Sequence, residues 1–138
     1  MRAAQYNGRG VRVSNNGLER SLVCIGTASH DYGLLNDTFL IARDMFNGAE
    51  DVRRSGSAAL DICNVACGRA EVFYEMRLYP WDYAAAQLIL LEAGGKATDF
   101  YGRGLNYEDI TSLLATNGVV HSRAQEIILR HWKRRENE

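Results

Sequence analysis

The sequence predicts an α/β fold, specifically a three-layer α/β/α sandwich with helices on both faces of one sheet. Short apolar segments of strand type alternate along the chain with longer segments of helical periodicity, and that alternation is typical of this architecture. The length of 138 residues suits one domain, and 46% hydrophobic and 24% charged residues are ordinary for a globular protein. Ligands of such sheets bind where strand ends meet helix N-termini.

The residue pattern of the first part of the chain predicts two strands, a helix and a third strand. Apolar and β-branched residues favour strands at 10–14 and 22–27. Residues 33–48 are expected to form an amphipathic helix that ends near Gly48. Its apolar positions at helical spacing are Leu34, Leu35, Phe39 and Ala42. A short strand at 52–54 follows.

The middle of the chain predicts a helix, a strand and a second helix. Ser55 is the expected N-cap of a helix over 56–68, which closes at Gly68. A strand over 72–76 precedes a helix over 80–93. Proline suits the first position of that helix because its N–H would have no partner inside the helix anyway.

The last part predicts two strands around a polar loop and then a final helix. The strands are expected at 97–100 and 113–116, with a glycine-containing loop over 101–109. The last helix is expected to begin near Ser122 and to end within 133–135, where cations complement the helix dipole.

Asp82 has an unusual position for an acid, near the start of the helix over 80–93. At helical spacing it aligns with apolar residues, which predicts that its carboxylate lies at the tip of the apolar face. These residues are Ala85, Ala86, Ile89 and Ala93. Because a buried charge is costly without a partner or a metal, the position favours a functional acid. The alternative is a helix cap, since an acid in the first turn accepts free N–H groups.

Three ordered motifs resemble the inositol monophosphatase family. The W-D-x-A-A segment with E-A-G-G at the far end of the same helix, residues 81–95, resembles the second signature of that family. Residues 53–61 resemble its R-x-x-G-[ST]-A-A segment, and 72–75 resemble the strand that follows. Residues 7–14 resemble the strand pair that ends its first domain. The resemblance implies the α/β/α sandwich of the family's C-terminal domain.

The resemblance also implies roles for individual residues. Asp82 would be the catalytic acid that binds Mg²⁺ and also touches the substrate. Substrate hydroxyls would contact Gly56, Ser57, Ala58 and Glu75. The free N–H groups of a helix start and an acceptor-only carboxylate suit a polyol. The alternatives are a tight strand-to-helix turn at 56–58 and a solvated strand end at Glu75. Asp31 and Asp37 are interpreted as a loop residue and a helix cap rather than metal ligands.

Two family motifs have no counterpart in this sequence. There is no D-P-x-D-G-[ST] segment and no Glu-Glu pair, which carry the other metal ligands. We therefore expect residues 1–16 to be a remnant strand pair of the first domain and 17–138 to be the C-terminal α/β domain. The expected function is substrate recognition in a Mg²⁺-dependent phosphomonoesterase acting on inositol 1-phosphate or a similar polyol phosphate, with no activity in the isolated chain. The alternatives are a non-catalytic binding or assembly module and half of a nucleotide or sugar bisphosphate phosphatase.

The composition of the chain limits the classes of partner and the cellular compartment that we expect. A net charge of -1 gives no support for nucleic-acid binding, and no apolar run is long enough for a membrane span. Three cysteines without a paired framework favour a reducing cytoplasm. We expect a homo-oligomer or a complex with a separate N-terminal half, because the lost domain interface would be apolar.

Overall fold

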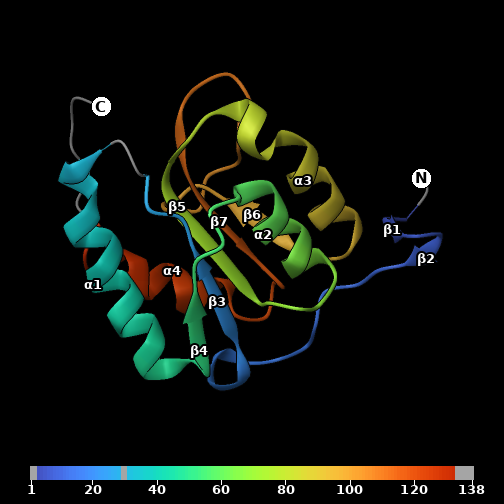
Figure 1. The fold of residues 1–138 in the computed structure, drawn as a ribbon, viewed down its shortest axis with the longest axis horizontal. Helices are drawn as coiled ribbons and strands as arrows, with labels where there is room; N and C mark the ends of the chain where they lie inside the picture. The colour runs from blue at the N-terminus through green and yellow to red at the C-terminus, as the bar shows by residue number, and fades with distance from the viewer. Residues whose placement is uncertain (1–2, 29–30, 133–138) are drawn as a thin grey trace.

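A computed structural model of the chain describes residues 3–28 and 31–132 and shows three layers (Figure 1). The middle layer is a five-stranded sheet in the order β4-β3-β5-β7-β6. Its strands are β3 (Leu22–Ile25), β4 (Asp51–Arg53), β5 (Val72–Leu78), β6 (Lys96–Thr98) and β7 (Thr111–Thr116). Strands β4, β3 and β5 are parallel, whereas β7 pairs antiparallel with both β5 and β6. The predicted α/β/α sandwich is confirmed.

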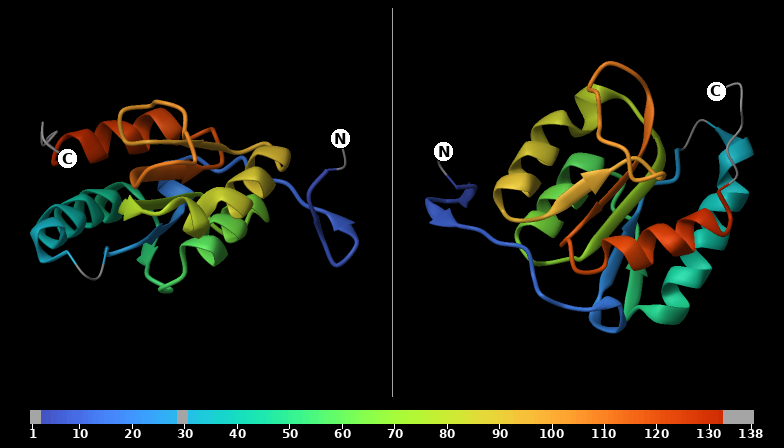
Figure 2. Two further views of the ribbon diagram at one scale, coloured as in Figure 1. Left: turned by 90° about the horizontal axis from the view of Figure 1, so that it is seen from above. Right: turned by 180° about the vertical axis from the view of Figure 1, so that it is seen from behind.

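Two helices cover each face of the sheet (Figure 2). The helices α1 (Tyr32–Gly48) and α4 (His121–Leu129) share one apolar core with Val72 and Tyr74 of β5. The helices α2 (Ala58–Ala66) and α3 (Pro80–Glu92) share a second core with Phe73. Because neighbouring side chains of a strand point to opposite faces, β5 contributes to both cores. In the part of the chain that the structure describes, no helix is long and apolar enough to cross a membrane.

The N-terminal segment differs from the strand expected at 10–14. Strands β1 (Gln5–Tyr6) and β2 (Arg9–Gly10) form a small hairpin outside the main sheet. Asn7 and Gly8 connect them with φ of 52° and 79°, the backbone that a tight two-residue hairpin turn requires. Residues 11–17 then run extended without joining a strand.

Residues 11–17 are held against the main domain by two buried polar side chains. The carboxylate of Glu71 accepts hydrogen bonds from Ser14 Oγ at 2.9 Å and from the N–H of Leu22 at 2.7 Å. The amide of Asn117 donates to the carbonyls of Ser14 and Asn16 at 3.2 and 3.0 Å. Together with the carbonyls of Ala4 and Ala93, which accept from the N–H groups of Val11 and Val13, these side chains give the segment hydrogen bonds without a strand pairing.

Two helix boundaries also differ from the prediction. The N-cap of α2 is Ser57 and not Ser55, because the helix begins at Ala58. The helix α4 ends at Leu129. The predicted end within 133–135 lies outside the described residues.

Candidate functional site

A pocket of about 530 Å³ opens where strand ends and helix N-termini meet, at the edge of the sheet that the fold class predicts. It is lined by Ala28, Asp31, Gly56, Ala58, Glu75, Arg77, Leu78, Tyr79 and Asp82. Ser57 lines an adjoining hollow of about 80 Å³ together with Gly56, Ala58 and Glu75. The structure therefore places all five predicted site residues around one continuous depression.

The turn before α2 presents backbone to this depression. Gly56 has a φ of 89°, which a residue with a side chain rarely adopts. The N–H of Ser57 donates to Ser55 Oγ at 3.1 Å, and Ser57 Oγ accepts from the N–H of Leu60 at 3.3 Å. The Ser57 oxygen therefore caps α2, while its hydroxyl proton stays available to a ligand.

Glu75 is half-buried and reaches back across the end of β3. Its Oε1 accepts a hydrogen bond from the N–H of Ala28 at 3.1 Å. Burial raises the pKa of this carboxyl, and the nearby Asp82 carboxylate raises it further. Glu75 is thus not a solvated strand end, and its side chain lines both the pocket and the adjoining hollow.

Asp82 occupies the third position of α3 and takes part in capping the N-terminus of that helix. Its Oδ2 accepts from the N–H of Tyr79 at 3.0 Å, so the contact of the helix-cap alternative is present. The prediction that Asp82 lies at the tip of the buried face is wrong, because Ala85 and Ile89 are exposed. The buried face of α3 consists of Tyr83, Ala86, Gln87 and Leu90. Asp82 lies at the border of that face, where its carboxylate lines the pocket.

Sequence reasoning missed Arg77 and underrated Asp31. Asp31, the expected loop residue, caps α1 by accepting from the N–H of Gly33 at 3.1 Å, whereas Asp37, the expected cap, lies within that helix. Its other oxygen lies 3.5 Å from Arg77 Nη1 across the pocket rim. Nothing in the local pattern of β5 marked Arg77, because its position depends on a bulge in the pairing of that strand.

A second group of polar side chains holds the turn before α2 through hydrogen bonds outside the pocket. Asp61 is buried, and Ser55 Oγ donates to it at 2.8 Å. Burial raises the pKa of Asp61, and burial together with Asp61 raises the pKa of the Cys24 thiol to about 12. Cys24 therefore stays a protonated donor. Arg54 donates from Nε to Thr27 Oγ1 at 3.1 Å and ties the turn to the end of β3.

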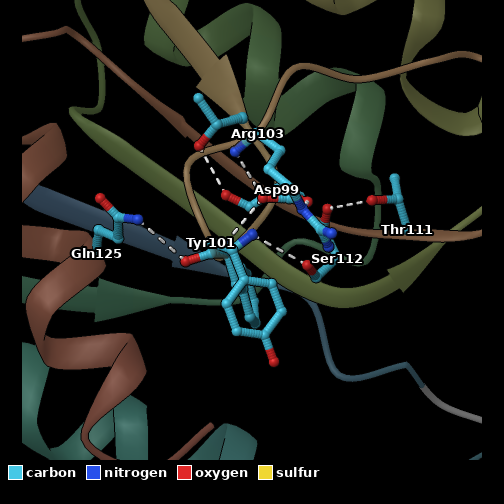
Figure 3. Close-up of polar contacts among 8 residues, drawn as sticks. Asp99, Tyr101, Arg103, Thr111, Ser112 and Gln125 are labelled. Carbon is cyan, nitrogen blue, oxygen red and sulfur yellow. Dashed lines mark hydrogen bonds and ion pairs between the residues drawn. The ribbon is translucent and has the colours of Figure 1, made fainter. Parts of the chain in front are cut away.

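The loop between β6 and β7 borders a separate hollow of about 850 Å³ beyond Tyr79 and Trp81. Figure 3 shows how Asp99 organises this loop. Asp99 Oδ1 accepts from the N–H groups of Tyr101 and Arg103 at 2.9 and 2.8 Å, and Oδ2 accepts from Arg103 Nε at 2.7 Å. Because the loop uses both oxygens of Asp99, this acid has a structural role.

The metal-binding capacity of the pocket rests on few carboxylates. Within residues 3–28 and 31–132, no three His, Cys, Asp or Glu side chains gather as ligands of one ion. Asp82 nevertheless suits Mg²⁺, which uses one or two carboxylates and completes its shell with water and phosphate oxygens. Its Oδ1 has no hydrogen bond among the described residues, so one oxygen remains for an ion.

Comparisons with known proteins agree with the resemblance of the motifs. The model of the inositol monophosphatase family matches residues 1–136. The putative Nus factor SuhB of Neisseria meningitidis is 37% identical over 131 residues, which are 94% of this chain and 50% of that protein. The chloroplastic phosphatase IMPL1 of Arabidopsis thaliana is 37% identical over 126 residues, covering 91% of this chain and 34% of that protein.

Solved structures show the same fold. The Thermotoga maritima IMPase superposes with a TM-score of 0.83 at 32% identity, over 93% of this chain and 48% of that one. SaIMPase-II with inositol monophosphate bound superposes with a TM-score of 0.80 at 28% identity, over 94% of this chain and 50% of that one. The chain thus spans between about a third and a half of the length of these relatives.

Proposed function

Because this chain belongs to the inositol monophosphatase family, we propose that it forms the substrate-recognition part of a Mg²⁺-dependent phosphomonoesterase for inositol 1-phosphate or a similar small polyol phosphate. The observation that carries the proposal is the meeting of the turn at 56–58, Glu75 and Asp82 around one pocket. The inositol monophosphate bound to SaIMPase-II supports the substrate class.

Each part of the pocket has a task in this proposal. Glu75 accepts a hydrogen bond from a ring hydroxyl, and the start of α2 donates N–H groups to ring oxygens. These contacts orient the ring, which is the positioning part of catalysis. Asp82 holds Mg²⁺ through its free oxygen. The ion, when bound, neutralises phosphate charge and lowers the pKa of a bound water.

We place the protein in the cytoplasm and give it no nucleic-acid or membrane partner. All three cysteines, which lie in the described part of the chain, are free thiols, as a reducing compartment keeps them. The acids of the pocket and the net charge of -1 do not attract a phosphate backbone.

Two alternatives have support of their own. A nucleotide substrate is supported by the structure of 2'-AMP-bound SaIMPase-II and by the Tyr79–Trp81 pair, whose stacked rings lie 4.7 Å apart beside the pocket. An exposed aromatic pair of this kind offers a face on which a base stacks. A non-catalytic assembly module is supported by the relatives named Nus factor SuhB.

The test is phosphate release from inositol 1-phosphate at millimolar Mg²⁺. We expect no hydrolysis by the 138-residue chain alone, because one carboxylate binds a reluctantly dehydrating ion weakly. We expect hydrolysis when the N-terminal half of the Thermotoga maritima IMPase is added. Co-purification of the two halves without hydrolysis would contradict the enzyme proposal and favour the assembly module.

In that reconstituted enzyme, Asp82→Asn is the decisive variant. Asparagine still accepts from the N–H of Tyr79, so α3 starts normally. Losing a metal ligand should lower turnover by more than the roughly 10- to 100-fold that loss of an outer ligand contact costs. The matched control is Asp109→Asn, an exposed acid in the loop before β7, which should keep full turnover. Wild-type turnover in Asp82→Asn would show that Asp82 is only a cap.

A further inference from the structure

The pocket carries an uneven set of charges. Among the described residues that line it, three side chains are carboxylates and Arg77 alone is a cation. The carboxylates Asp31, Glu75 and Asp82 suit hydroxyl donors and a metal ion, and the proposed function uses two of them. It leaves Arg77 without a task.

A β-bulge brings Arg77 to the pocket. Glu75 pairs with Leu113 of β7, whereas Leu78 pairs with Thr111, so β5 contains one residue more than its partner over this stretch. A bulge bends its strand and redirects the side chains beside it. As a result Arg77 and Leu78 both line the pocket although they are neighbours in sequence.

The one ion pair of Arg77 among the described residues leaves most of its donors free. Arg77 Nη1 lies 3.5 Å from Asp31 Oδ2, and the two side chains are 47% and 34% exposed. Such a long, solvated pair contributes little. A guanidinium has five N–H donors in a planar fork that matches two oxygens of a phosphate. Asp31 keeps its place without Arg77, because its other oxygen caps α1.

We propose that Arg77 is a specificity residue that binds a second anionic group of the substrate, so that the pocket selects polyols carrying two phosphates over those carrying one. This rests on the proposed function, in which Asp82 marks the end of the pocket that takes the phosphate to be hydrolysed. A monophosphate placed there leaves the fork of Arg77 facing only Asp31. A second phosphate on the ring competes with that weak pair and gains bidentate contacts.

The test is a titration of the full chain, followed by the backbone amide signals of Ala28, Gly56 and Ala58 in NMR spectra, with three ligands. The ligands are myo-inositol, inositol 1-phosphate and inositol 1,4-bisphosphate. We expect the bisphosphate to bind about 5- to 10-fold more tightly than the monophosphate, the factor that one solvated charge-assisted contact supplies. In Arg77→Gln this preference should vanish, while myo-inositol binding stays unchanged.

Two further variants sharpen the result. Arg123→Gln removes the same charge from α4, which packs on the face of the sheet opposite α2 and α3. This variant should keep the preference for the bisphosphate. Asp31→Asn keeps an N-cap for α1 and removes the competing carboxylate, so it should strengthen bisphosphate binding. The amide spectra themselves report whether each variant is folded.

The outcomes separate this inference from the function on which it rests. Binding of inositol and the monophosphate without any gain from a second phosphate would overturn the inference alone. Equal weakening of both phosphates in Arg77→Gln would also overturn it, because Arg77 would then hold the phosphate to be hydrolysed. Unmoved pocket amides with all three ligands would overturn both.

Discussion

At the scale of single residues, the close approach between the end of β3 and Glu75 places the carboxylate that the proposed function uses. A Cβ on Gly26 would lie 2.3 Å from both Cδ and Oε2 of Glu75, far inside contact distance. Only a residue without a side chain lets this half-buried carboxylate lie across the strand end and accept from Ala28. The same closeness explains part of its desolvation.

Gly26→Ala should therefore displace Glu75 and weaken inositol binding at least about 5-fold, since a hydrogen bond to a charged group is lost. Stability should fall by only about 1 kcal/mol, because the obstacle is a side chain that can move. Amide-signal titration with myo-inositol measures the first effect and urea unfolding the second. The control is Gly104→Ala, where an added Cβ meets nothing within 4 Å. Unchanged inositol binding in Gly26→Ala would remove Glu75 from the site.

Arg77 shows why part of the site could not be predicted from the sequence. Asp82 and Glu75 stand in motifs of fixed local spacing, so the resemblance could name them as candidates. Arg77 reaches the pocket only through the pairing of β5 with a strand that comes more than 30 residues later. A bulge of this kind has no local signal in residues 72–78.

At the scale of elements, His121 joins α4 to two strands. It is buried, with Nε2 2.9 Å from Thr98 Oγ1 of β6 and Nδ1 2.9 Å from Thr116 Oγ1 of β7. Thr98 donates its own proton to the carbonyl of Asp99, so it accepts from an Nε2–H. Thr116 accepts from the N–H of Gly118 and donates to Nδ1. The histidine is thus assigned as the neutral Nε2–H tautomer.

Lowering the pH should decrease the stability of the protein through His121. Burial and then Lys96 lower the pKa of His121 from 6.5 to about 4 in the folded protein. The unfolded chain takes up a proton between these values and the folded one does not, so stability is full above pH 6.5 and falls toward pH 4. The loss is roughly 2–3 kcal/mol. Urea unfolding at pH 7.0, 5.5 and 4.5 measures it.

Two histidine variants identify the source of that pH dependence. His121→Gln should be less stable at pH 7 but should lose less stability on acidification. His131→Gln, which breaks the partly buried pair with Asp44, should retain the loss that comes from His121. An unchanged acid response in His121→Gln would show that other groups cause it.

Helix boundaries were predictable only where local chemistry decides them. The helix α3 begins at Pro80 as expected, because proline's fixed φ favours that position. Two serines precede α2, and the prediction of Ser55 as its cap was wrong. The structure assigns the cap to Ser57 because Ser55 donates instead to the buried Asp61, a contact that depends on the tertiary fold.

At the scale of the whole molecule, α2 and α3 lie side by side on one face of the sheet (Figure 1). Both helices carry exposed apolar side chains. Trp81 is 78% exposed and Leu60 is 63% exposed. The other exposed apolar residues of α3 include Leu88, Ile89 and Leu91. Exposed apolar side chains on neighbouring helices favour association.

We expect the chain to form dimers or larger oligomers at tens of micromolar, as measured by light scattering. Leu88→Glu should shift it toward the monomer, because burying a charge in an apolar contact is costly. Phe39→Glu makes the same kind of change on α1, which covers the other face of the sheet, and should leave association unchanged. A monodisperse monomer of the unmodified chain would contradict the expectation.

The strand order affects how the protein folds while the ribosome synthesises it. The edge strand β6 is synthesised before β7, yet β7 lies between β6 and the rest of the sheet. Until residues 111–116 leave the exit tunnel, β6 has no neighbour and one side of β5 stays open. An open strand edge invites pairing with other chains. The nascent polypeptide is therefore vulnerable to aggregation between the emergence of β6 and that of β7, and insertion of β7 ends that interval.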